Sequence, residues 1–128
     1  MRSAALSRSM FQTRKPPRAW RPAWKCAEEY RRWLRKLQCA RCGQHGTETN
    51  PIMAAHVDHA GGKGTSTKVA DRHCIPLCND CHAEQHRLGW LTFEKLLPMA
   101  DAPALAGVFW MEWPGRVAWE REFAGQER

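Results

Sequence analysis

The chain has 128 residues and a mass of 14.7 kDa, which is enough for one domain with a modest core and too little for a second catalytic domain. Hydrophobic residues make up 43% and charged residues 26%, as in ordinary globular proteins. No apolar run approaches the roughly 20 residues that cross a bilayer, and the N-terminus lacks the features of a secretory signal. We therefore expect a soluble, cytoplasmic protein without membrane contact.

The positive charge lies at the start of the chain. Residues 1–38 hold eleven basic and two acidic side chains, a net charge of +9, whereas the remaining residues hold nine basic and eleven acidic ones, a net charge of −2. Such a segment favours a polyanionic partner, because each phosphate that Lys or Arg neutralises releases condensed counterions. A solubilising tail is the alternative. Residues 1–24, with three prolines and no sustained hydrophobic period, are expected to form a basic, flexible arm.

A helix is predicted next, over residues 25–38. Its apolar side chains recur at helical spacing: Cys26, Tyr30, Trp33, Leu34 and Leu37. Arg31 and Arg35 face elsewhere and form a cationic flank, for which phosphate contact and plain solvation are the two interpretations.

Two CxxC pairs follow the helix, Cys39-Ala-Arg-Cys42 and Cys78-Asn-Asp-Cys81, with 35 residues between them. Each CxxC turn places two thiolates on one side of a tight bend, and two such turns brought together make a closed, tetrahedral zinc site of the structural kind. A redox pair and disulfides are the alternatives. Cys26 and Cys74 stand outside the pairs and are expected as small buried side chains.

Two short strands are predicted after the first CxxC pair, over residues 51–57 and 73–78, and the second strand ends at the first cysteine of the second pair. Pro76 indicates an edge or bulge position in the second strand. The Gly- and Lys-rich segment 61–68 between the strands is expected to be a flexible loop and lacks the residue order of a Walker nucleotide-binding loop.

The rest of the chain is predicted to be helical. Asn79 or Asp80 is expected to cap a helix over residues 81–88 that ends at Gly89. Residues 96–128 are expected to form a C-terminal helical extension. Large aromatic side chains should fill the core or an interface here: Trp90, Trp110, Trp113 and Trp119.

Candidate catalytic side chains concentrate between His56 and His86. On the predicted helix, His82 and His86 lie four residues apart on one face, so both can hold a single divalent ion. Asp58 can add an oxygen ligand, and a mixed donor set with open positions suits a catalytic ion. A further histidine can deprotonate water, because imidazole ordinarily titrates near pH 6.5. The alternative is that some of these histidines only satisfy hydrogen bonds in the core or extend the zinc site.

These residues resemble the HNH endonucleases, in which a hairpin and a helix surround one catalytic divalent ion and a four-cysteine zinc often braces the fold. The resemblance covers about residues 30–95. Its segments 30–43, 54–57, 68–71 and 75–87 look like the phage and prophage nucleases related to the recombination-enhancement (Ref) nuclease. The resemblance implies an α+β fold with a zinc-braced ββα-metal (HNH) core over residues 25–95, flanking helices and the basic arm. It also implies metal-dependent hydrolysis of DNA phosphodiester bonds.

The resemblance assigns roles to several residues. The zinc ligands are matched by Cys39, Cys42, Cys78 and Cys81. His82 matches the helical histidine that holds the catalytic metal, and His86 matches a second helical ligand or phosphate partner. Where the family carries an Asn near the helix, this chain has Asp71 or His73.

The strand histidine has two possible registers. Asp58-His59 copies the family's dyad, in which the first residue binds metal and the second is the general base. His56 fits the end of the strand and the Ala-His-Val signature of the closer relatives, but Ala55 before it cannot bind metal. His56 and His59 are therefore alternative bases, with Asp58 as the metal ligand in either register.

The resemblance also implies cofactors and partners. Zn²⁺ is expected as the structural ion and Mg²⁺ or Mn²⁺ as the catalytic ion, with Zn²⁺ or Ni²⁺ as alternatives. DNA is the expected partner, and a recombinase filament is a further one. The side chains expected to contact phosphates are Lys63, Lys68, Arg87, Arg31 and Arg35. A zinc-containing DNA-binding module without catalysis is the alternative function, and Ala55 keeps it open.

Overall fold

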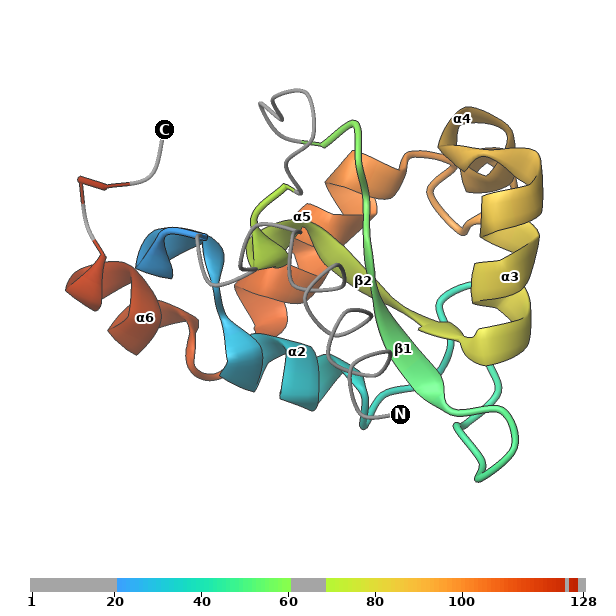
Figure 1. Ribbon diagram of the computed structural model, residues 1–128, viewed down its shortest axis with the longest axis horizontal. Helices are drawn as coiled ribbons and strands as arrows, with labels where there is room; N and C mark the ends of the chain where they lie inside the picture. The colour runs from blue at the N-terminus through green and yellow to red at the C-terminus, as the bar shows by residue number, and fades with distance from the viewer. Residues whose placement is uncertain (1–20, 61–68, 124, 127–128) are drawn as a thin grey trace, which may run out of the picture.

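The computed structural model describes residues 21–60, 69–123 and 125–126 (Figure 1). Most of the predicted arm and the whole of segment 61–68 lie outside these residues. The elements in chain order, with η for a 3₁₀ helix, are η2 (Ala23–Lys25), α2 (Glu28–Leu34), β1 (Ile52–His56), η3 (Asp71–His73), β2 (Cys74–Cys78), α3 (Asn79–Leu88), α4 (Trp90–Phe93), η4 (Glu94–Leu96), α5 (Ala102–Glu112) and α6 (Arg116–Glu122). The fold is a small α+β structure. Within the described segments, no helix combines the length and hydropathy needed to cross a membrane.

A two-stranded antiparallel sheet lies at the centre of the fold (Figure 1). Ile52 of β1 lies opposite Cys78 of β2 at one end, and His56 lies opposite Cys74 at the other. Both predicted strands are confirmed. Pro76 is tolerated in the middle of β2 because each strand of a two-stranded sheet is an edge strand. All five residues of β2 are buried, because helices pack against this strand.

Helix α3 begins directly after β2, without a linker. Its N-cap is Cys78, whose Sγ accepts a hydrogen bond from the backbone N–H of Cys81 at 3.4 Å. The expectation that Asn79 or Asp80 caps this helix is therefore wrong, because the strand runs straight into the first helical turn. The expected end of the helix is confirmed. Gly89 has φ +84°, a backbone conformation that residues with a Cβ rarely adopt.

The C-terminal helices and α2 complete a shared core. Tyr30 of α2 is fully buried, and its ring packs edge-on against Trp110 of α5 with centroids 4.9 Å apart. Trp113 lies 5.4 Å from the same ring. At its other end, α5 places Ala102 and Ala106 in the cluster formed by β1, β2 and α4. Residues after position 95 therefore supply side chains to both hydrophobic clusters of the core.

The tryptophans and the two cysteines outside the CxxC pairs were expected to be buried in the core. Trp90, Trp110 and Trp113 are buried as expected, and Trp119 packs at the edge of the cluster. Cys74 is completely buried, which confirms the expectation for it. The same expectation is wrong for Cys26, which is exposed because the chain forms η2 and an extended turn before α2 begins at Glu28.

Candidate functional site

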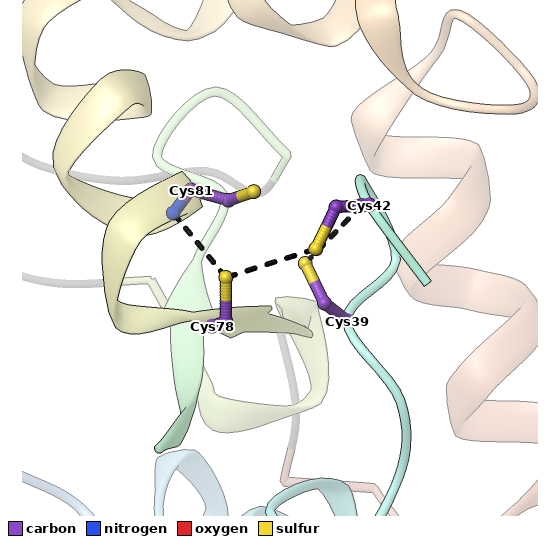
Figure 2. Close-up of side chains that lie close together, drawn as sticks. All are labelled: Cys39, Cys42, Cys78 and Cys81. Atoms are coloured by element: carbon purple, nitrogen blue, oxygen red, sulfur yellow. Dashed lines mark hydrogen bonds between the residues drawn. The ribbon is translucent and has the colours of Figure 1, made fainter. Parts of the chain in front are cut away.

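The four cysteines of the CxxC pairs come together at one end of the hairpin (Figure 2). Cys39 and Cys42 lie in the turn that follows α2, whereas Cys78 ends β2 and Cys81 lies in the first turn of α3. Their four Sγ atoms all lie within 4.8 Å of one another, and all four cysteines are free thiols. The cluster could therefore hold a structural metal such as zinc, whose tetrahedral sites use this donor set.

Backbone amides point at the sulfur atoms of this cluster. The N–H groups of Arg41 and Cys42 donate to Cys39 Sγ at 3.3 and 3.4 Å. Burial raises the pKa of the Cys39 thiol, but backbone hydrogen bonds, chiefly from Cys42, outweigh burial and lower the pKa to about 7. Burial raises the pKa of Cys81 well above its ordinary value. Four adjacent thiolates are thus unfavourable by themselves, and a bound cation would relieve their repulsion.

A second group of polar side chains lies at the opposite end of the hairpin, around Asp71. Asp71 Oδ1 lies 2.9 Å from His56 Nε2 and 3.2 Å from Arg21 Nη1, and Oδ2 accepts the Ala27 N–H at 2.8 Å. The Asp71 side chain is 2% exposed and that of His56 is 14% exposed. His56 is thus held on its inner side by a buried carboxylate and reaches solvent on the other.

The partners of Asp71 keep its carboxylate ionised. Burial alone would raise the pKa of Asp71, but the hydrogen bonds from His56 and Ala27 and the charge of Arg21 outweigh it and hold the pKa below its ordinary value. A carboxylate can only accept hydrogen bonds, so Nε2 of His56 must be the donor. In the neutral ring, Nδ1 therefore carries the lone pair.

His82 and His86 lie together on α3, as their spacing predicts. Their ring centroids are 4.7 Å apart. Burial lowers the pKa of His82, and the charges of His86 and then His56 lower it further. His82 is therefore a neutral imidazole near pH 7, which is the form that binds metals.

Asp58 and His59 lie in the exposed turn that follows β1. His59 Nε2 lies 3.3 Å from Glu94 Oε1, and its ring lies 6.4 Å from that of Trp90. His59 thus contacts α4 and η4 rather than Asp71. In the described part of the chain, two groups of three or more possible metal ligands lie within 4.8 Å, and neither includes Asp58, His82 or His86. Asp58 is therefore not pre-placed against the helical histidines.

The cationic side chains expected to contact phosphates differ in their exposure and in their ion pairs. Arg31 and Arg35 both form ion pairs with Glu28, at 3.0 and 3.1 Å. The side chain of Arg87 is 70% exposed on α3 and lies 3.9 Å from Glu84. Lys63 and Lys68 fall outside the described residues. Arg87 is thus the described candidate that is both exposed and on the histidine-bearing helix.

Comparison with known proteins assigns a family. Residues 10–96 match the model of a family described as "Protein of unknown function (DUF968)", and since the match spans more than half of the chain, the chain belongs to this family. No curated protein and no solved structure matches the chain. The matched range includes both CxxC pairs, His56 and the whole of α3, whereas α5 and α6 lie beyond it.

The central role of Asp71 was not apparent from the sequence. Asp71 stood out only as a residue in the place of an expected Asn, and nothing in its neighbourhood indicated Arg21 or Ala27 as partners. Those partners lie 50 and 44 residues away along the chain. One signal could have found Asp71: it comes three residues before Cys74, and Cys74 begins the strand that pairs with the strand of His56.

Proposed function

We propose that the chain is a metal-dependent endonuclease of the HNH type that hydrolyses phosphodiester bonds in DNA. The order β1, β2, α3 supports this proposal, with His56 at the end of β1 and His82 and His86 on α3. The observation that carries the proposal is the 2.9 Å hydrogen bond between His56 and buried Asp71. It orients the His56 imidazole at the end of β1, the strand that packs against the helix carrying His82 and His86.

His56 is the general base of the proposed reaction. Its Nε2–H donates to Asp71, which leaves Nδ1 free to accept a proton from the attacking water. Asp71 is a positioning residue, because it fixes the tautomer and the ring orientation without touching the substrate. His59 was an equal candidate by sequence, but its contact with Glu94 turns it toward α4 and η4.

His82 and His86 are the side chains that would hold the catalytic divalent ion, Mg²⁺ or Mn²⁺. Such an ion polarises the scissile phosphate and stabilises the leaving 3′ oxygen. Asp58, in the exposed turn after β1, is proposed as an additional oxygen ligand. The burial that keeps His82 neutral excludes a competing proton from its metal-binding nitrogen.

DNA is the proposed partner, and positive charge would position it. Arg87 is exposed on the helix that carries the histidine pair, and the basic residues at the start of the chain would add affinity that is sensitive to salt and largely independent of sequence. Arg31 and Arg35 would first have to exchange their partner Glu28 for phosphate. The resemblance to Ref-like nucleases extends the proposal to phage or prophage recombination, with a recombinase filament as a partner.

The test compares two histidine variants on supercoiled plasmid DNA with Mg²⁺ or Mn²⁺. We expect His56→Ala to lower the nicking rate by about 10² to 10⁴-fold, the usual contribution of a general base. His59→Ala is the matched control and should change the rate by no more than a few-fold. Equal rates for wild type and His56→Ala would overturn the assignment of the base.

A second candidate function is a zinc-containing module that binds DNA without cleaving it. It is favoured by Ala55, which is 1% exposed and offers no ligand at the strand position before His56. The same plasmid experiment separates the two functions, because a binding module would retard the plasmid in a gel without nicking it at any metal concentration.

A further inference from the structure

The second group of possible metal ligands in the described residues lies at the end of the hairpin away from the CxxC pairs. The strand register places Cys74 directly opposite His56, and residues opposite each other in a ladder direct their side chains to the same face. Asp71 lies in the helical turn that leads into β2. As a result, one nitrogen, one oxygen and one sulfur from these three residues all lie within 4.8 Å of one another.

We infer that His56, Asp71 and Cys74 form a second zinc site, separate from the four-cysteine cluster and from the His82–His86 pair. A thiolate among the donors favours zinc over magnesium, which prefers oxygen ligands. Three protein ligands leave a fourth position on the ion, which a water molecule can fill. The site would take a thiophilic divalent cation, of which Zn²⁺ is the commonest in proteins.

The distance between His56 and Asp71 needs only a small adjustment for zinc, and the Cys74 sulfur lies within 4.8 Å of both ligand atoms. With zinc–ligand bonds of about 2.0–2.1 Å and tetrahedral angles, a ligating nitrogen and oxygen lie about 3.3 Å apart. His56 Nε2 and Asp71 Oδ1 lie 2.9 Å apart in the structure, held by a hydrogen bond. The two side chains would separate by a few tenths of an ångström as the ion replaces the bridging proton. The Cys74 thiol would give up its proton to solvent.

Arg21 opposes zinc at this site. Its Nη1 lies 3.2 Å from Asp71 Oδ1, so the guanidinium occupies one side of the oxygen that the ion would use. Arg21 has other partners if it moves away, because its Nη2 also donates to Val69 O at 2.9 Å and to Lys25 O at 3.4 Å. Replacing the guanidinium with a neutral side chain, as in Arg21→Gln, should therefore tighten zinc binding.

Zinc at this site would also switch off the proposed base, and this part of the inference rests on the proposed function. In the metal-free site, Nε2 carries the proton and Nδ1 is the acceptor. With zinc on Nε2, the neutral ring must carry its proton on Nδ1, so the ring can no longer accept one from water. An excess of Zn²⁺ should then slow cleavage that Mg²⁺ supports.

Metal stoichiometry tests the site without reference to activity. The background is full-length Cys26→Ser, which removes the exposed thiol and leaves Cys74 as the single cysteine outside the CxxC pairs. After equilibrium dialysis against Zn²⁺, we expect Cys74→Ala in this background to retain one equivalent of zinc fewer than the background itself. His82→Ala is the control for zinc on α3. Equal zinc contents with and without Cys74 would overturn the inference.

Cobalt gives a second measurement that needs no change at Cys74. Co²⁺ is added stepwise to the metal-free background protein, and the ultraviolet charge-transfer band of cobalt–thiolate bonds is followed. The four-cysteine cluster accounts for the band from one equivalent, and the helical histidine pair contributes none because it has no sulfur. We expect a further, smaller rise from a single additional thiolate. A band that stops growing after one equivalent would contradict the site, even if Cys74→Ala fails to fold.

The activity arm compares each protein with itself. The Mg²⁺-supported nicking rate is measured with and without added Zn²⁺. The rate with zinc divided by the rate without zinc should be well below one in the background protein and close to one in Cys74→Ala. Loss of a zinc equivalent without any nicking activity would leave the zinc site standing and reject the nuclease proposal. Nicking that is insensitive to zinc, together with an unchanged zinc content, would reject the zinc site alone.

Discussion

The two ends of one five-residue strand carry two different kinds of site. Where β2 ends at Cys78, four identical thiols face one another, and every coordination position would be filled by the protein. Where β2 begins at Cys74, the donors are mixed and one of them, His56, reaches solvent. A filled, uniform set of ligands serves stability, whereas a mixed set with an open side leaves room for water and substrate.

The hydrogen bonds of the two ends differ in range as well. At the cysteine end, the sulfur of Cys39 accepts from amides two and three residues further along the chain. At the histidine end, Asp71 is held by Arg21 and Ala27, which lie far away in the sequence. Each half of the first site is thus a local turn motif, whereas the hydrogen bonds of the second form only once α2 and the residues before it have packed on the hairpin.

Removing a ligand from the cysteine end should have the largest effect. In the zinc-loaded protein, Cys39→Ala should abolish cooperative folding, because structural zinc contributes about 10–16 kcal/mol of apparent binding energy and small domains have a net stability of about 5–15 kcal/mol. Circular dichroism during thermal unfolding measures the loss. Cys26→Ala is the control, since Cys26 is exposed and outside the cluster. A cooperative transition in Cys39→Ala near that of the wild type would contradict a structural zinc.

The next effect is on activity and not on folding. His82→Ala should lower metal-dependent nicking by about 10²-fold or more, because it removes a ligand of the proposed catalytic ion. Its melting temperature should stay close to the wild-type value, since His82 is not part of either hydrophobic cluster. His45→Ala, in the exposed loop before β1, is the matched control for a histidine away from the site. Full activity of purified His82→Ala would remove this residue from the mechanism.

Asp71 links stability at the histidine end to pH. Because its pKa is lower in the folded protein than in the unfolded chain, the ionised carboxylate stabilises the fold above the ordinary Asp pKa of about 4, and this contribution disappears as the pH falls through the folded-state pKa. Asp71→Asn should lower the free energy of unfolding at pH 7 by about 2 kcal/mol.

Urea unfolding between pH 7 and pH 3 measures this difference. The stabilities of wild type and Asp71→Asn should converge as the pH falls, whereas Asp80→Asn, on the exposed start of α3, should follow the wild type throughout. A constant difference between wild type and Asp71→Asn over this range would show that the carboxylate charge is not what stabilises this end of the hairpin.

The smallest effect concerns one hydrogen bond behind the histidine end. Tyr30 Oη donates to the carbonyl oxygen of Cys74 at 3.2 Å, inside the core. Tyr30→Phe keeps the ring packing against Trp110 and removes this bond, so it should cost about 1 kcal/mol in the free energy of unfolding. Chemical denaturation with an unchanged m-value measures it. A cost near zero would mean that water or another donor satisfies the carbonyl.

Much of the fold could be predicted from the sequence, because it rests on short-range patterns. Short runs of strand-forming residues placed both strands within a residue or two, and Gly89 marked the end of α3 through its backbone freedom. Each CxxC turn brings its own two sulfurs together, and the i, i+4 spacing alone puts His82 and His86 on one face. These features depend on residues within one or two turns of each other.

Tertiary packing decided the rest. Local patterns could not show that His56 and His59 have different partners, because Asp71 and Glu94 are brought to them by other segments. The same reason explains why equal expectations for Cys26 and Cys74 had opposite outcomes. Burial and long-range hydrogen bonds are properties of the packed chain, so a sequence pattern indicates which residues can do chemistry, and only the packing selects which of them are placed to do it.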